Sequence, residues 1–191
     1  LSKGLAVFCQ KPLGRNEEET RQVVETARER DLLLGVDFTY RQTAAVRQLR
    51  KIIRRDDLGA IHSVELTFHN AYGPDKGWYH NRELAGGGCL MDLGIHLVDL
   101  LYHTLELSPD SIRSVCSRVS HRGRPLEAGV NLVEDHATSL LLFDGGPSVQ
   151  LSCSWNLPAG RDAVIEMALY GEKGGARFHN LNGSFYDFVT D

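Results

Sequence analysis

The chain has 191 residues, of which 42% are hydrophobic, and a formal net charge of −4 at neutral pH. This length and apolar content suffice for one to one and a half folded domains and exclude wholesale disorder. The acidic balance and the lack of a basic stripe argue against nucleic acid as a partner. We expect no stretch long and apolar enough to span a bilayer, and therefore no membrane partner.

The first elements in the chain are typical of a βαβ unit. A strand is expected over Leu5–Cys9, and a second buried strand over Leu32–Phe38. Between them Asn16 is a good helix N-cap, Glu19 completes a capping-box pattern, and the helix should end near Arg30. A strand, a helix and a strand in about 35 residues predict a parallel pair of strands.

The next elements alternate between helix and strand. An amphipathic helix follows Tyr40-Arg41 and closes at Leu58-Gly59. Alternating polarity over Ile61–Phe68 predicts a half-buried strand, and Asn70–Gly88 is a loop long enough to be functional. A central helix is expected over Cys89–Leu105.

The remaining residues are expected to form strands joined by short turns, such as the turn at 144–147. This pattern favours an antiparallel sheet, so we predict a short parallel α/β piece to about Asp37 and then an α+β domain. The expected strands are Ile112–Val119, Asp135–Phe143, Ser148–Trp155, Val164–Tyr170, Ala176–Phe178 and Ser184–Val189.

The four cysteines are scattered along the chain without CxxC spacing. We interpret Cys9, Cys89, Cys116 and Cys153 as buried free thiols rather than disulfide partners, which is typical of the reducing cytoplasm. The first residue is Leu1 rather than methionine. We therefore expect the chain to be an internal piece of a longer protein, with any targeting segment out of view.

A stripe of acids and histidines marks the central helix. Asp92, His96, Asp99 and His103 fall at positions i, i+4, i+7 and i+11 of an otherwise leucine-rich segment. One interpretation is that each acid pairs with the histidine four residues later inside the core, as Asp92–His96 and Asp99–His103, and that these contacts are structural. We favour this interpretation for the second pair. For Asp92 and His96 we favour a functional role, because they begin the helix beside three glycines and the long loop.

Two other interpretations concern the same residues. The stripe could bind a metal ion, but no further ligands stand at standard spacing, so we expect no metal. Lys11 could be an ordinary surface residue before a proline. It follows a strand of the βαβ unit, however, and such sheets bind ligands at the carboxyl ends of their strands. A lysine, an aspartate and a histidine suffice for acid–base chemistry on a hydroxyl or carbonyl.

Three motifs resemble those of the Gfo/Idh/MocA family, the NAD(P)-dependent sugar and cyclitol dehydrogenases typified by glucose–fructose oxidoreductase and inositol dehydrogenase. Gln10-Lys11-Pro12 resembles the family's Glu-Lys-Pro at a strand end, and Tyr40-Arg41 resembles its Tyr-Arg. Gly86–His96 matches Gly-Gly-Gly-x-x-x-Asp-x-Gly-x-His at every fixed position. Later segments are similar too: Asp135, Trp155 and Asn182–Tyr186.

The resemblance implies a fold in two parts. Residues 1–37 would be the C-terminal remnant of a dinucleotide-binding Rossmann domain, which is α/β. Residues 38–191 would be an α+β domain for substrate binding, catalysis and oligomerisation, with a large open, mainly antiparallel sheet. Self-association into a homo-oligomer through the open sheet face is expected.

The resemblance also implies hydride transfer between NAD or NADP and a sugar, cyclitol or related polyol. Lys11, Asp92 and His96 would be catalytic: the histidine exchanges a proton with the reacting hydroxyl, the aspartate orients or charges the histidine, and the lysine lies near nicotinamide and substrate oxygen. The expected cofactor contacts are Gln10, Lys11, Pro12, Arg41 and Trp78.

Three departures from the family pattern stand out. Gln10 replaces the usual glutamate, Trp78-Tyr79 stands where the family has Trp-Arg, and no Gly-x-Gly-x-x-Gly follows a strand. We therefore expect the chain to lack most of the dinucleotide-binding half. The alternatives are a non-catalytic ligand-binding or scaffold protein with this fold and, less favoured, a metal-dependent hydrolase or lyase.

Overall fold

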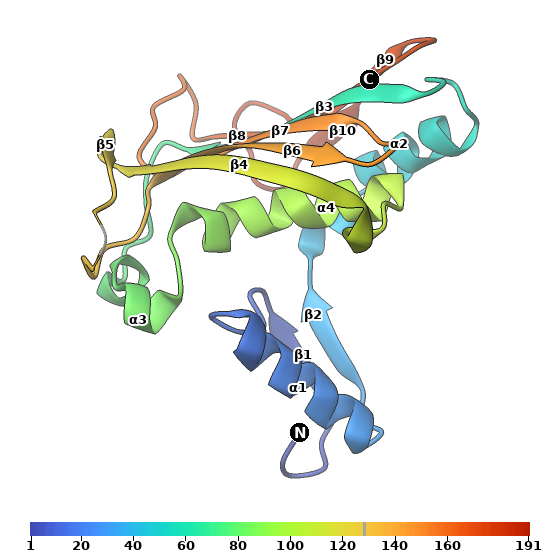
Figure 1. Cartoon of the computed structure of the whole chain (residues 1–191). Coiled ribbons are helices and arrows are strands. Elements are labelled where there is room, and N and C mark those ends of the chain that lie inside the picture. Colours follow the sequence, from blue (N-terminus) through green and yellow to red (C-terminus); the bar gives the residue numbers. More distant parts are fainter. Residues whose placement is uncertain (128) are drawn as a thin grey trace.

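The structure, a computed structural model, describes residues 1–127 and 129–191. Its strands form a two-stranded sheet and an eight-stranded sheet. In Figure 1 the small sheet and its helix lie below, and the large sheet lies above with a long helix beneath it. The strands of the small sheet lie within residues 7–37, and those of the large sheet lie within residues 61–190.

The small unit is the predicted βαβ arrangement. Strand β1 (Val7–Gln10) and strand β2 (Leu34–Asp37) are parallel, and helix α1 (Glu17–Glu29) connects them. Asn16 caps the helix by accepting a hydrogen bond from the Glu19 backbone N–H at 2.9 Å. The second half of the capping box differs from the prediction, because the Glu19 carboxylate accepts from the backbone N–H of Arg15 instead, at 2.8 Å.

The strands of this unit are less buried than the sequence predicts. Phe8 is 75% exposed and Leu33 is 81% exposed, since α1 covers one face of the pair and nothing among the described residues covers the other. The apolar runs gave the correct element type and pairing, but the expectation of burial is wrong for this chain.

The large sheet has the strand order β10-β9-β8-β3-β7-β6-β4-β5. Its neighbours are antiparallel except β3 and β7, which run parallel. The prediction of a mainly antiparallel sheet is confirmed, with one parallel pair at its centre that the turn pattern did not reveal. The strands are β3 (Ile61–Asn70), β4 (Ile112–His121), β5 (Arg124–Pro125), β6 (His136–Phe143), β7 (Ser148–Ser154), β8 (Ala163–Gly171), β9 (Gly175–Asn180) and β10 (Phe188–Thr190).

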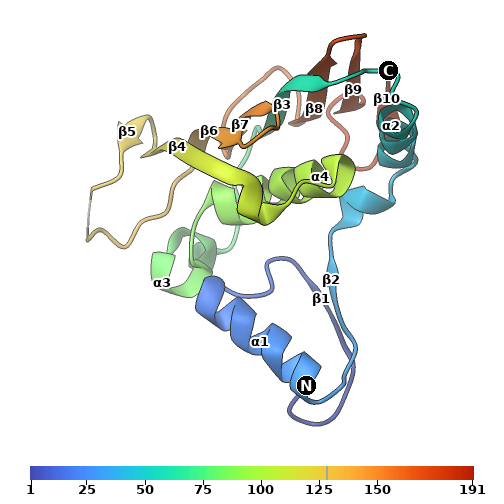
Figure 2. The same ribbon diagram turned by 45° about the vertical axis from the view of Figure 1, so that its right-hand side comes forward.

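Two helices cover one face of this sheet. Helix α2 (Ala44–Arg54) lies at one end, and α4 (Ile95–Leu105) runs along the sheet (Figure 2). Alternate side chains of the central strands pack on α4 and form the core, while no helix of the described residues covers the opposite face of the sheet. The fully buried members at this contact include Val64, Leu97, Leu101, Val149 and Cys153.

The central helix is not a regular α-helix over its whole predicted length. Leu90–Gly94 forms a π-helical turn before α4 begins, a departure of the kind often found at functional sites. The expected loop before it contains a 3-10 turn, Gly77–His80, and a short helix α3 (Arg82–Ala85).

We expected no segment long and apolar enough to span a membrane, and by length and composition this expectation is wrong. Arg82–Leu105 is long and apolar enough to cross a membrane, although half of its apolar window is buried inside the protein. The core helix of a folded domain has the same composition. The buried residues of α4 include Asp99, which packs with the core rather than facing outward.

Candidate active site

Lys11 and Asp92 meet although 81 residues separate them. The Lys11 ammonium, just past the end of β1, donates a hydrogen bond to Asp92 Oδ1 at 2.7 Å and another to the Asp92 carbonyl oxygen at 2.5 Å. Both side chains are largely buried, with 16% and 23% of their surface exposed. The predicted convergence of the amine and the carboxylate is therefore present in the structure.

Trp155 completes the surroundings of the Asp92 carboxylate. Its indole Nε1 donates to Asp92 Oδ2 at 3.0 Å, so each carboxylate oxygen accepts one hydrogen bond. The backbone N–H of Trp155 donates to the Asp135 carbonyl at 2.7 Å, which fixes the end of β7. The sequence pointed to Trp155 only through the family resemblance and gave it no role.

Glu134 holds the start of the helix that carries Asp92. Its Oε1 accepts hydrogen bonds from the backbone N–H groups of Gly88 at 2.9 Å and Leu90 at 3.0 Å. A carboxylate at a helix start satisfies groups that have no helical partner and favours the helix dipole. A Cβ on Gly88 would lie 1.9 Å from the Glu134 carbonyl oxygen, so only glycine fits there.

The sequence analysis missed Glu134. The available signal was an acidic pair, Glu134-Asp135, at the start of a predicted strand, with apolar residues close on either side. Glu134 is 8% exposed. Buried carboxylates require partners, so such a pair is a candidate for holding other backbone segments in place.

His96 lies one helical turn beyond Asp92 among aromatic rings. The centroid of its ring is 4.9 Å from that of Tyr40 and 6.1 Å from that of Phe68. Burial and the nearby Lys11 ammonium lower the pKa of His96 to about 4, against the opposing effect of Asp92 and Asp37. The imidazole is therefore neutral at neutral pH.

The expected Asp92–His96 contact does not form within the described part of the chain. Asp92 directs its carboxylate to Lys11 and Trp155 instead. The reason is geometric: spacing at i and i+4 places two side chains on one face, but the other elements packed there decide their partners. The structure thus has Asp92 orienting the lysine rather than the histidine.

The second acid–histidine pair of the stripe does not form either, because Asp99 and His103 each contact an arginine instead. Asp99 accepts from Arg41 Nε at 2.9 Å and 2.7 Å, and Arg50 Nη1 lies 3.0 Å from His103 Nε2. The predicted Asp99–His103 pair is therefore wrong, although both side chains have polar partners, as expected. Arg41 belongs to this structural cluster and does not line the cavity beside Lys11.

A cavity of about 480 Å³ opens beside Lys11 and Asp92. Of the expected cofactor contacts, Gln10, Lys11, Pro12 and Trp78 line it, and Arg41 does not. His96 is not among the lining residues either. The rings of Trp78 and Tyr79 are stacked with centroids 3.8 Å apart and form part of the wall.

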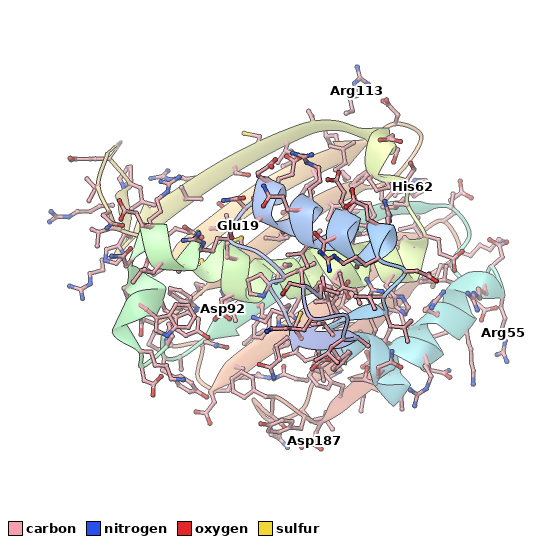
Figure 3. All side chains as sticks on the ribbon, turned by 90° about the horizontal axis from the view of Figure 1, so that it is seen from below. Glu19, Arg55, His62, Asp92, Arg113 and Asp187 are labelled. Carbon is pink, nitrogen blue, oxygen red and sulfur yellow. The ribbon has the colours of Figure 1, made fainter. Side chains whose placement is uncertain are left out.

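The cavity lies between α1 and the central helix. Figure 3 views the molecule with α1 in front and labels Glu19 on that helix and Asp92 on the element behind it. Arg15 and Glu19 line the same cavity from the side of α1. Among the residues that the structure describes, no three histidines, cysteines or acids gather as a metal site would require.

Comparison with known proteins identifies the family of the chain. Residues 46–177, more than half of the chain, match the family described as GFO/IDH/MocA C-terminal domain, so the chain belongs to the Gfo/Idh/MocA family. It is 28% identical to the D-glucoside 3-dehydrogenase of Escherichia coli (strain K12) over 92% of this chain and 52% of that protein.

Two further comparisons extend the likeness. The chain is 25% identical to the glucose-6-phosphate 3-dehydrogenase of Bacillus subtilis (strain 168) over 99% of this chain and 55% of that protein. The crystal structure of GenD2 from gentamicin A biosynthesis in complex with NAD superimposes with a TM-score of 0.81 at 29% identity, over 93% of this chain and 48% of that one. The chain spans about half the length of the curated relatives it matches.

Proposed function

We propose that this chain carries the catalytic residues of an NAD(P)-dependent oxidoreductase. The reaction would move hydride between a nicotinamide cofactor and a hydroxyl-bearing carbon of a sugar, cyclitol or related polyol. The observation that carries the proposal is the meeting of Lys11 and Asp92 at a cavity, with the neutral imidazole of His96 one helical turn away. Membership of the family and the sugar dehydrogenases among its relatives support it.

Each of the three residues has a distinct chemical task in this proposal. His96 is neutral, so it has a free ring nitrogen that can accept the proton of the reacting hydroxyl. The Lys11 ammonium stabilises the negative charge that develops on that oxygen. Asp92 holds Lys11 in place, and Trp155 holds Asp92.

The cavity wall is suited to a nicotinamide ring. A bound nicotinamide would supply the acceptor for the hydride. Gln10, Lys11 and Pro12 lie where β1 ends, and Trp78 adds a flat apolar surface. NAD and NADP are both compatible with these contacts. Arg41, in contrast, is held by Asp99, and we assign it a structural role.

The remaining proposals concern organisation. Residues 1–37 would complete a dinucleotide-binding domain, and residues 38–191 would form the substrate and oligomerisation domain. A second copy of the chain would cover the open sheet face, where Leu140, Leu142 and Tyr170 are exposed. The four free cysteines fit the cytoplasm, although Cys116 is exposed and Cys9 is half-buried, whereas both were predicted to be buried.

The test is nicotinamide reduction by the protein at its full natural length, measured across a panel of sugars and polyols. We expect a rise in absorbance at the wavelength of the reduced cofactor with at least one member of the panel. A protein that binds sugars but reduces no cofactor would instead be a ligand-binding member of the family.

A further inference from the structure

We propose that Glu134 is a positioning residue of the proposed active site. It sets the place of the Lys11 ammonium through the helix start that carries Asp92, and it does so by the reach of its hydrogen bonds rather than by its charge. This inference rests on the proposed function, because its main consequence is a change in turnover. Glu134 itself does not line the cavity beside Lys11, so it acts through other residues.

Glu134 binds three successive backbone N–H groups where the central helix begins. Its Oε1 accepts from Gly88 at 2.9 Å and from Leu90 at 3.0 Å, and its carbonyl oxygen accepts from Cys89 at 2.9 Å. A helix start leaves such groups without partners inside the helix. The first residues of the helix are therefore tied to Glu134 through both its side chain and its main chain.

From this helix start the restraint reaches Lys11 in two further steps. The Gly88 carbonyl accepts from the Asp92 N–H at 3.0 Å, and Lys11 donates to the Asp92 carbonyl oxygen at 2.5 Å and to Oδ1 at 2.7 Å. Because Lys11 binds the main chain of Asp92 as well as its carboxylate, a shift of the helix start moves the ammonium. A displacement of about 1 Å at a reacting group is enough to reduce turnover on the order of 10²-fold.

Glu134 is itself fixed by its neighbours in the chain. Val133 is 2% exposed, and its carbonyl oxygen lies 3.0 Å from His121 Nδ1. On the other side the Asp135 N–H donates to the Ser120 carbonyl at 3.0 Å. His121 and Ser120 belong to β4, so the segment that carries Glu134 is attached to a strand of the large sheet. A positioning group is effective only when it is held in this way.

The contacts of Glu134 indicate that reach matters more than charge. Its listed donors are neutral backbone groups, and among the described residues no lysine, arginine or histidine forms an ion pair with it. Two variants separate the two properties. Glu134→Gln keeps a carbonyl oxygen at the same distance from the backbone but removes the charge. Glu134→Asp keeps the charge but shortens the side chain by one methylene, so it no longer spans to both N–H groups.

The first measurement is steady-state kinetics of the protein at its full natural length with nicotinamide cofactor. We expect Glu134→Gln to keep kcat within about fivefold of the wild type, the scale of a charge at a helix start. Glu134→Asp and Glu134→Ala should lower kcat by about 10- to 100-fold with a smaller change in KM. The matched control is Asp99→Ala, because Asp99 is also 8% exposed and lies on the same helix but binds Arg41. It should lose stability and keep kcat.

The second measurement does not depend on turnover. Acetylation of Lys11 by acetic anhydride is followed by mass spectrometry, with the exposed Lys173 of the same protein as the internal reference. Loosening the hold on Lys11 should raise its relative rate by about two- to tenfold in Glu134→Asp and Glu134→Ala, the equivalent of one hydrogen bond. Glu134→Gln and Asp99→Ala should leave this rate unchanged.

The outcomes separate this inference from the proposed function. A wild-type kcat in Glu134→Asp, or an unchanged rate at Lys11, overturns the inference and leaves hydride transfer standing. A loss in Glu134→Gln as large as that in Glu134→Asp overturns it too, because charge would then be the cause. If Glu134→Ala does not fold, the other two variants decide. Turnover of no sugar by the wild type contradicts the proposed function, and the acetylation rates alone then decide whether Glu134 positions Lys11.

Discussion

The central helix carries the same spacing twice, an aspartate followed four residues later by a histidine, and the structure uses the two pairs differently. Asp92 holds Lys11 beside a cavity, and His96 lies neutral among aromatic rings. One turn further, Asp99 pairs with Arg41, and His103 lies against Arg50.

The difference comes from what packs against each half of the helix. The first half faces the strand end that carries Lys11, where a cavity remains. The second half faces the 3-10 turn Thr39–Gln42 and α2, whose arginines occupy the space beside it. Equal spacing therefore does not imply equal function, and substitutions at matched positions can separate catalysis from stability.

The largest expected effect is on turnover at His96. His96→Ala should lower kcat by about 10²- to 10⁴-fold, the usual contribution of a positioned acid or base, while cofactor binding stays nearly intact. His103→Ala should keep kcat and cost about 1 kcal/mol of unfolding free energy, because Arg50 loses a partner. Steady-state kinetics and denaturant unfolding measure both; normal turnover in His96→Ala would show that the assignment is wrong.

Substitutions of the two aspartates should likewise differ in whether they affect turnover or stability. Asp92→Asn should reduce turnover more than stability, because it weakens the hold on Lys11. Asp99→Asn should lower the free energy of unfolding by about 1–3 kcal/mol, the value of hydrogen bonds to a charged partner, and leave kcat close to that of the wild type. Equal losses of turnover in the two variants would contradict the division.

The pH dependence of stability tests the burial of His96. Its pKa is about 4 in the folded state and near 6.5 in the unfolded state, so the unfolded chain takes up the proton first as the pH falls. The stabilisation that comes from keeping the imidazole neutral is therefore fully present above pH 6.5 and decreases as the pH falls toward 4. The free energy of unfolding should fall by about 2 kcal/mol between pH 7 and pH 5. Urea unfolding at several pH values measures it.

The matched control for this prediction is His96→Gln, which removes the titrating ring. His69 and His103 also have lowered pKa values, through burial, and contribute in the same direction. The decisive quantity is therefore the difference in slope between the wild type and the variant. Identical slopes would mean that His96 is accessible to protons in the folded protein.

The smallest expected effect is at Trp155. Trp155→Phe keeps the aromatic packing and removes the indole N–H that binds Asp92, so we expect kcat to fall by about tenfold, the equivalent of one hydrogen bond to a charged group. KM for the sugar should change less than kcat. A fall in thermal stability with kcat unchanged would show that Trp155 serves the core alone.

Much of the fold could be read from local pattern. The periodic apolar residues of α2, the capping residue Asn16 and the alternation in β3 predicted their elements within a few residues. The π-helical turn at Leu90–Gly94 could not be read in this way, because its apolar and glycine pattern is equally compatible with a regular α-helix.

For the candidate site, too, the sequence and the tertiary structure determined different features. The sequence by itself determined which groups are available: Lys11 at a strand end, Asp92 and His96 on one helix face, and three glycines just before that helix. Only the tertiary structure decided the pairing, giving Asp92 to Lys11 and Asp99 to Arg41. The physical reason is that local spacing fixes the direction of a side chain, whereas its partner comes from elements distant in the chain that pack against it.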